Sequence, residues 1–318
     1  MTNKQEQIVL SFMSVNAMAF VGIFLSVAFN YRLAADDFHH VSLIRELGIW
    51  DAMIFYYDNW NTRWSSILVT NTFLAYGENK IVLFLFHCCS LLLGSVTFYS
   101  VIRSLVKSLG IPLSKTHSFI SAVYLLLVAF YSSFSKPDSW FWITVNPMYL
   151  WGALVALLGG SLILQKWYPP VRQLLVAILF LYVGGASESD AICALVVLLY
   201  VGIQTRRNTT KSIDRNALHI ATISCMIGFG ISMLGTGSEI RREHLPHYPI
   251  SERLLVGMWN YIKFNLKEIP SILPIAVIGV TPIGFWGRKH LRFQLMSIKD
   301  VVWANRKLWI LADLMVAI

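Results

Sequence analysis

Charged residues are scarce in this sequence of 318 residues, since only 14% are Asp, Glu, Lys or Arg and 56% are hydrophobic. A soluble domain of this length carries about 25% charged residues. The shortage of charge excludes an ordinary soluble domain. Together with repeated apolar runs, it predicts an all-α, polytopic transmembrane helical bundle. In such a protein a net charge of +9 reflects membrane topology, so no nucleic-acid partner is expected.

Several motifs of well-known chemistry are missing. The sequence contains no Walker motif, dinucleotide fingerprint, HExxH or GxSxG, so it gives no support for ATP-driven chemistry or serine hydrolysis. The four cysteines lie in apolar segments without the spacing of metal ligands. The adjacent Cys88 and Cys89 are expected to be packing residues and not a disulfide, which leaves the redox compartment open.

Apolar runs of sufficient length predict about eight complete membrane spans and part of a ninth. The last run starts at Leu308 and has only 11 residues, so we expect a ninth span that is truncated. Residues 1–318 would form a single transmembrane domain, without a separate soluble domain, whose first span is a retained anchor. The fifth and sixth spans are short and could instead be a re-entrant pair. The predicted complete spans are 8–29, 81–102, 118–134, 148–164, 173–187, 190–204, 217–235 and 270–287.

The loop charges predict the orientation. If the N-terminus is cytoplasmic, the cytoplasmic segments hold 16 of the 26 basic residues and only three of the 17 acids. Polar function would then lie on the outer face of the membrane, expected to be a bacterial inner membrane, in the long loops 30–80 and 236–269. The stretch 40–58 and the aromatic loop 135–147, with its neighbouring Trp and Phe residues, are expected to lie in the headgroup zone as interfacial helices.

Two adjacent carboxylates, Asp36 and Asp37, directly follow the first predicted span. Beside a low-dielectric surface, neighbouring carboxylates raise each other's cost of ionisation, so one can act as a base near neutral pH. We expect this base to be Asp36, with Asp37 as a helix cap or a cation ligand. The pair can equally bind a divalent cation, with His39 as a further ligand. The alternative is a solvated pair that ends the span and caps a helix.

An arginine between two tryptophans forms the second candidate group, Trp60, Arg63 and Trp64, in the stretch YYDNWNTRWSS. A guanidinium held by indole rings at a membrane surface can bind a phosphate through two parallel hydrogen bonds. The alternative is an ordinary interfacial aromatic belt with a snorkelling arginine. A shared catalytic site requires Arg63 within roughly 15 Å of Asp36 or Asp37.

Two further stretches contain candidate binding residues. Glu188 and Asp190 follow the fifth predicted span in VGGASESDA, and acids at such depth usually face a cavity, unless the bend simply emerges into water. Arg241 and Arg242 follow a Gly-rich turn in GTGSEIRREHLPHYP. Such a loop suits a phosphate or a charged lipid headgroup, although a hydrophilic loop of mixed charge is an equal alternative.

The order of these motifs resembles the GT-C superfamily of integral-membrane glycosyltransferases, and is closest to an uncharacterised bacterial family within it. Members of that family show a DD just after the first span and a W-x-x-R-W-like stretch about 25 residues later. They also show an acid that ends a middle span and a Gly-Asn-x-x-R-like loop. The corresponding stretches here are Asp36–Asp37, WNTRWSS, GGASESD and GTGSEIRRE. One departure is Glu239, which follows Gly237 and Ser238 where the family pattern has Gly-Asn.

The resemblance implies a GT-C-like bundle with helices on its outer face and an inverting transfer of sugar from a polyprenyl phosphate. The acceptor would be a cell-envelope glycan, lipid or protein. A carboxylate of the first loop, Asp36 or Asp37, would be the base, and Arg63, Arg241 or Arg242 would neutralise the leaving phosphate. Some relatives use a divalent cation such as Mg²⁺ or Mn²⁺ and others use none, so the resemblance leaves the cofactor open.

Two other classes of protein share some of these features. A transporter or flippase for a lipid-linked sugar or another anion would also need acids and arginines. Transporters, however, commonly place broken helices and charges at mid-membrane, whereas the charges here are predicted to gather on the outer face. A structural membrane subunit whose outer loops dock a partner enzyme is the third alternative.

Overall fold

A computed structural model describes residues 3–108, 113–133, 137–165, 168–207, 213–243 and 259. Within these ranges the chain is helical and contains no strand, as the composition predicts. The elements in chain order are α1 (Asn3–Phe29), α2 (Asp36–Asn59), α3 (Trp64–Leu74), α4 (Lys80–Ser108), α5 (Lys115–Ser132), the π-helical turns η1 (Pro137–Phe141) and η2 (Pro147–Trp151), α6 (Gly152–Ile163), α7 (Pro169–Ala186), α8 (Glu188–Arg207), α9 (Arg215–Leu234) and α10 (Gly237–Glu243).

Five of these helices, α1, α4, α7, α8 and α9, are long and apolar enough to cross a membrane. Two shorter apolar helical segments, Lys115–Tyr131 and Pro147–Ile163, coincide with the third and fourth predicted spans. The predicted spans 173–187 and 190–204 correspond to the separate long helices α7 and α8. The predicted span 270–287 and the run from Leu308 lie outside the described residues. The membrane-protein assignment is therefore confirmed, and the structure supports five spans by length and composition.

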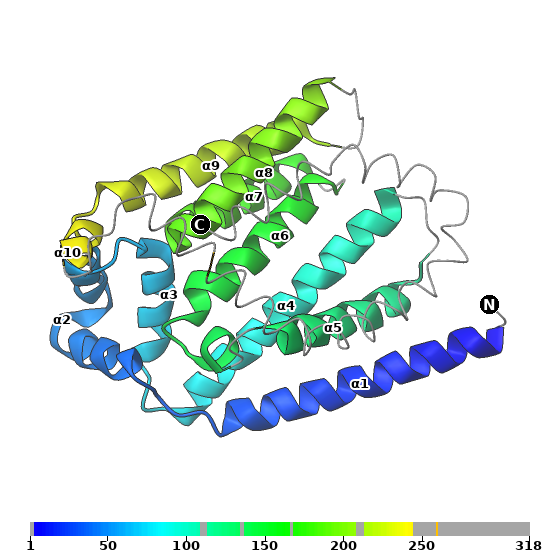
Figure 1. Ribbon diagram of the computed structural model, residues 1–318, viewed down its shortest axis with the longest axis horizontal. Helices are drawn as coiled ribbons and strands as arrows, with labels where there is room; N and C mark the ends of the chain where they lie inside the picture. Colours follow the sequence, from blue (N-terminus) through cyan, green and yellow to red (C-terminus); the bar gives the residue numbers. More distant parts are fainter. Residues whose placement is uncertain are drawn as a thin grey trace.

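The long helices run alongside one another, and α2, α3 and α10 gather at one end of this bundle (Figure 1). The predicted interfacial stretch 40–58 is helical but kinked, because Gly48 inside α2 has φ 84° and ψ 173°, a conformation that only glycine adopts readily. One side of α2 is buried and includes His40 and Tyr56, whereas Trp50 is 64% exposed. The kink lets both arms of α2 contact α3.

Helices α7 and α9 approach closely because small residues face each other. A Cβ atom placed on Gly184 would lie 2.3 Å from the carbonyl oxygen of Cys225 and 3.0 Å from the Cα of Gly228. Next to this contact, the indole of Trp64 lies against Gly185, where a Cβ would lie 2.5 Å from the ring. The two glycines therefore allow α7 to pack between α9 and the start of α3.

In the described part of the aromatic loop, residues 137–147, two of the rings pack inside the protein and are not exposed on its surface. Trp140 is only 1% exposed and Phe141 is 8% exposed. The Trp140 ring contacts those of Phe24 in α1 and Phe130 in α5, and its Nε1 donates to the Ser133 hydroxyl at 2.8 Å. Burial against two helices hides more apolar surface than an interfacial position would, so these rings form a core.

Candidate functional site

A pocket of about 520 Å³ lies at the end of the bundle that holds α2 and α3. Its walls come from both arms of α2, the 60–67 segment and the 144–149 segment, and they carry groups of opposite charge. The lining residues are Asp36, His39, His40, Phe55, Tyr56, Asn59, Trp60, Asn61, Arg63, Ile67, Thr144, Val145, Met148 and Tyr149. Asp36 and Arg63 thus line the same pocket, as a shared site requires.

The two adjacent carboxylates have different environments. Asp36 is exposed and lines the pocket, whereas Asp37 is 0% exposed. Asp37 accepts hydrogen bonds from the Tyr31 hydroxyl at 2.6 Å, the Ala34 N–H at 3.1 Å, and both the N–H (3.1 Å) and the hydroxyl of Thr144. Burial, and then the Asp37 charge, raise the pKa of Tyr31, so this phenol stays a donor. Asp37 therefore joins the first loop to the 142–145 segment.

The backbone has an unusual conformation at Ala35, the residue before α2, where φ is 41°. A positive φ is uncommon for a residue with a Cβ, and such strain persists only where the surrounding structure imposes it. Here the Asp37 side chain holds the N–H of Ala34. The result is that α2 starts with Asp36 at the pocket and Asp37 turned into the protein.

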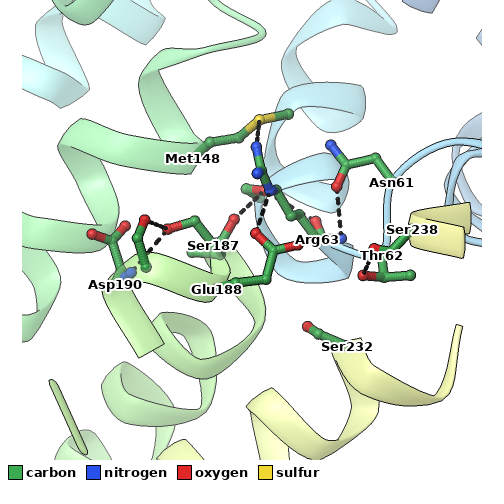
Figure 2. Close-up of polar contacts among 12 residues, drawn as sticks. Asn61, Thr62, Arg63, Met148, Ser187, Glu188, Asp190, Ser232 and Ser238 are labelled. Carbon is green, nitrogen blue, oxygen red and sulfur yellow. Dashed lines mark hydrogen bonds and ion pairs between the residues drawn. The ribbon is translucent and has the colours of Figure 1, made fainter. Parts of the chain in front are cut away.

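The Arg63 guanidinium is fixed by hydrogen bonds and lies beside the Glu188 carboxylate (Figure 2). Its Nε donates to Glu188 at 2.9 Å and its Nη1 donates to the Tyr149 hydroxyl at 2.9 Å. Burial lowers the pKa of Arg63, but Tyr149 and Glu188 outweigh this effect and the net shift is upward. Within the described residues Nη2 has no hydrogen-bond partner, so one side of the guanidinium can bind a further anion.

The other predicted site residues divide into three groups. Trp60 is 46% exposed and lines the pocket. Trp64 is not among the lining residues, because it packs on Gly185 and its Nε1 donates to the carbonyl of Gly228 at 3.2 Å, so it positions α3. The backbones of Arg241 and Arg242 belong to α10, but their side chains lie outside the described structure.

The two predicted outer loops meet beside the pocket. The Thr62 and Ser238 hydroxyls are 2.8 Å apart, and the Thr236 hydroxyl donates to the carbonyl of Asp58 at 2.7 Å. A Cβ on Gly237 would lie 2.6 Å from the carbonyl oxygen of Tyr57, so this close contact requires glycine. The prediction that the two loops share one side of the protein is confirmed for residues 57–62 and 235–243.

His40, which the sequence suggested only weakly as a metal ligand, lines the pocket with a defined ring orientation. Its Nδ1 lies 2.9 Å from Asn71 Oδ1, and Asn71 Nδ2 donates to the carbonyl of Ile49 at 3.3 Å. Because the amide nitrogen faces Ile49, the amide oxygen accepts from His40, and Nδ1 carries the proton. The ring stacks on Tyr56 at 4.0 Å between centroids. Burial lowers the pKa of His40, and the opposing effects of Asn71 and Asp37 are smaller.

Metal ligands are not grouped around the carboxylate pair. Among the described residues, no group of three or more His, Cys, Asp or Glu side chains could hold a metal ion. Both oxygens of Asp37 already accept hydrogen bonds, so a cation at this pair would take its protein ligands from Asp36 and His39. Mg²⁺ commonly binds through one or two carboxylates together with water and substrate phosphate, so Asp36 could hold it only with such further ligands.

Comparison of the chain with protein-family models, curated proteins and solved structures gives no match.

Proposed function

We propose that this protein is a membrane glycosyltransferase that takes its sugar from a polyprenyl phosphate at the non-cytoplasmic face. The observation that carries the proposal is the pocket that holds the Asp36 carboxylate and the Arg63 guanidinium at one end of a membrane bundle. A lipid-linked donor suits this position, because its tail can remain in the bilayer while its headgroup enters the pocket. The acceptor would be a cell-envelope glycan, lipid or protein.

In the proposed reaction the Asp36 carboxylate acts on the acceptor, and the Arg63 guanidinium acts on the leaving phosphate. A hydroxyl of the acceptor attacks the anomeric carbon, and the bond from that carbon to the phosphate oxygen breaks with inversion. Asp36 takes the proton of the hydroxyl, and the bonding electrons leave with the polyprenyl phosphate. Arg63 stabilises the negative charge that develops on the leaving phosphate, which is where a fixed cation contributes most. Asp37 joins the segment before α2 to the 142–145 segment through its hydrogen bonds. It takes no part in proton transfer.

Transport of a lipid-linked sugar fits the pocket less well. The lining residues come from α2, the 60–67 segment and the 144–149 segment, and none of them belongs to the five helices that are long enough to cross a membrane. Transporters commonly bind their substrate near the middle of the bilayer, between broken membrane helices. A pocket at one end of the bundle favours chemistry at the membrane surface.

Transfer of a labelled hexose from polyprenyl phosphate to an envelope extract tests the proposal. The protein is reconstituted in lipid nanodiscs, and Asp36→Asn is compared with Asp51→Asn. Asp51 is an exposed acid on the same helix that does not line the pocket. Loss of the base should lower transfer on the order of a hundredfold, whereas the Asp51 variant should retain the parent rate. Equal transfer by all three proteins would exclude Asp36 as the base.

A further inference from the structure

Two residues of the pocket wall are buried, and each has a polar group without a hydrogen-bond partner in the described part of the chain. His40 is 3% exposed and Tyr56 is 5% exposed. The Tyr56 hydroxyl has no hydrogen-bond partner among the described residues, and the bond to Asn71 uses only Nδ1 of His40. Because buried polar groups are nearly always hydrogen-bonded, the unpaired Tyr56 hydroxyl points to a ligand that supplies its partner. His40 Nε2 is not one of the fully buried atoms without a partner, so a molecule in the pocket can reach it.

The orientation of His40 decides what kind of partner it needs. Since Nδ1 donates to Asn71, the neutral ring presents Nε2 as an acceptor. The amide oxygen of Asn71 stabilises an imidazolium less than the carboxylate that many histidine bases have behind the ring, and burial outweighs its effect. Burial also lowers the pKa of His40, which keeps the ring neutral at neutral pH. His40 therefore accepts a hydrogen bond through Nε2, and its low pKa makes it a poor proton carrier at neutral pH.

The position of His40 relative to the charged groups indicates which ligand reaches it. Asp36 and His40 are four residues apart on α2, so their side chains lie on the same helical face, and both line the pocket. Arg63 lines the same pocket from the start of α3. In a glycosyl transfer the sugar ring lies between the phosphate and the base. A group beside the base therefore faces the ring and its hydroxyls.

We propose that His40 is a sugar-recognition residue, whose Nε2 accepts a hydrogen bond from a hydroxyl of the hexose carried by the polyprenyl phosphate. The stacked Tyr56 ring fixes the imidazole plane, and its unpaired hydroxyl makes a second hydrogen bond to the same sugar. This inference rests on the proposed function, because it assigns the sugar moiety of that donor to a subsite. It predicts that His40 distinguishes a sugar-bearing lipid from the bare lipid phosphate.

Two substitutions separate recognition from a structural role. In His40→Asn, the amide nitrogen replaces Nδ1 and keeps the bond to Asn71, but nothing replaces Nε2. In His40→Gln, the longer side chain places an amide oxygen near the Nε2 position but loses the bond to Asn71. A recognition role therefore predicts that the Gln variant binds the sugar better than the Asn variant. A purely structural role predicts the reverse order.

The experiment measures binding of polyprenyl-phosphate hexose and of polyprenyl phosphate to the full chain in nanodiscs. For His40→Asn we expect about tenfold weaker binding of the hexose lipid and unchanged binding of the bare lipid phosphate, as loss of one neutral hydrogen bond implies. Tyr56→Phe should act in the same direction. If His40→Asn binds both lipids like the parent, the recognition role is excluded while Arg63 can still hold phosphate. If the parent binds neither lipid, the proposed function itself fails.

Discussion

Asp36 and Asp37 are neighbours in the sequence, but one lines an open pocket and the other is completely enclosed by protein. The enclosed carboxylate accepts hydrogen bonds from Tyr31, Ala34 and Thr144. The first two lie in the segment before α2, and Thr144 lies between η1 and η2. A pair of equivalent ligands or bases would require both side chains on the same side. The structure instead divides the pair into a pocket group and a structural group.

The first prediction follows from this division. Asp37→Ala should lower the free energy of unfolding by about 3 kcal/mol, because it leaves several donors unpaired in the protein interior. Asp36→Asn should change it by less than about 0.5 kcal/mol, because Asp36 is exposed. Thermal unfolding of both variants in detergent measures the difference. Equal stability of the two variants would show that the buried bonds of Asp37 do not hold the loop.

The second prediction concerns the side on which the loops lie. In a chain without its four native cysteines, Ser42→Cys in α2 and Ser238→Cys in α10 should both react with a membrane-impermeant thiol reagent in intact cells. Ser108→Cys, at the far end of α4, should react only after the membrane is opened. All three serines are exposed. Reaction of Ser108→Cys in intact cells, or of only one of the other two, would contradict the topology.

The membrane class and the order of the helices could be predicted from sequence because apolar length is a local property. The charged residues at the span ends also indicated the region of the candidate site, since Asp36 and Arg63 line the same pocket. The partners of these residues could not be predicted in this way. Thr144 lies 107 residues from Asp37, and Glu188 lies 125 residues from Arg63, and no local pattern encodes such contacts.

Two further features depend on distant contacts in the same way. Trp140 reads as an interfacial tryptophan because aromatic residues at span ends usually lie in the headgroup zone, but its burial depends on α1 and α5. His40 was considered only as a weak candidate for a metal ligand, because a pair of adjacent histidines carries little information by itself. The one signal that could have identified it is Asn71, an amide between Thr70 and Thr72 in the largely apolar stretch ILVTNTFL. A buried amide needs a partner, and His40 supplies it.

The third prediction tests the close contact of α7 with α9. Gly184→Ala should destabilise the fold by about 2 kcal/mol, because its Cβ would lie 2.3 Å from the carbonyl oxygen of Cys225, a backbone atom that cannot move alone. Gly160→Ala in α6 is the matched control, since nothing lies within 4 Å of its Cβ. The control should be neutral or stabilising by up to about 1 kcal/mol, because alanine favours helix. Thermal unfolding compares the two, and equal effects would contradict the packing.

The fourth prediction is a pH dependence of stability due to His40. Its folded pKa is lowered by burial, so the folded chain binds this proton more weakly than the unfolded chain, whose histidine pKa is about 6.5. The resulting penalty is absent well above pH 6.5 and grows as the pH falls below it. Unfolding measured between pH 7.5 and about 5 should therefore show a steeper loss of stability for the parent than for His40→Asn. Identical slopes would contradict a buried neutral His40.

The last prediction concerns the ion pair between Arg63 and Glu188. Glu188 balances the charge of the Arg63 guanidinium, and its carboxylate would repel a phosphate that approaches the same guanidinium. Glu188→Gln keeps an oxygen that accepts from Arg63 Nε but removes the negative charge. Binding of polyprenyl phosphate in nanodiscs should therefore tighten about threefold to tenfold, and added salt should reduce this gain, because screening weakens both the repulsion and the attraction.

Substitutions of arginine provide the control for that measurement. Arg63→Lys keeps the charge but loses the planar fork that binds phosphate through two hydrogen bonds, so binding should weaken about tenfold. Arg45→Gln removes an exposed arginine that pairs with Glu78 and does not line the pocket, and it should bind like the parent. If Glu188→Gln weakens binding as much as Arg63→Lys does, the ion pair serves only to hold α3 and α8 together. Arg63 would then not be the phosphate ligand, because removing a competing carboxylate can only favour an anion that binds the same guanidinium.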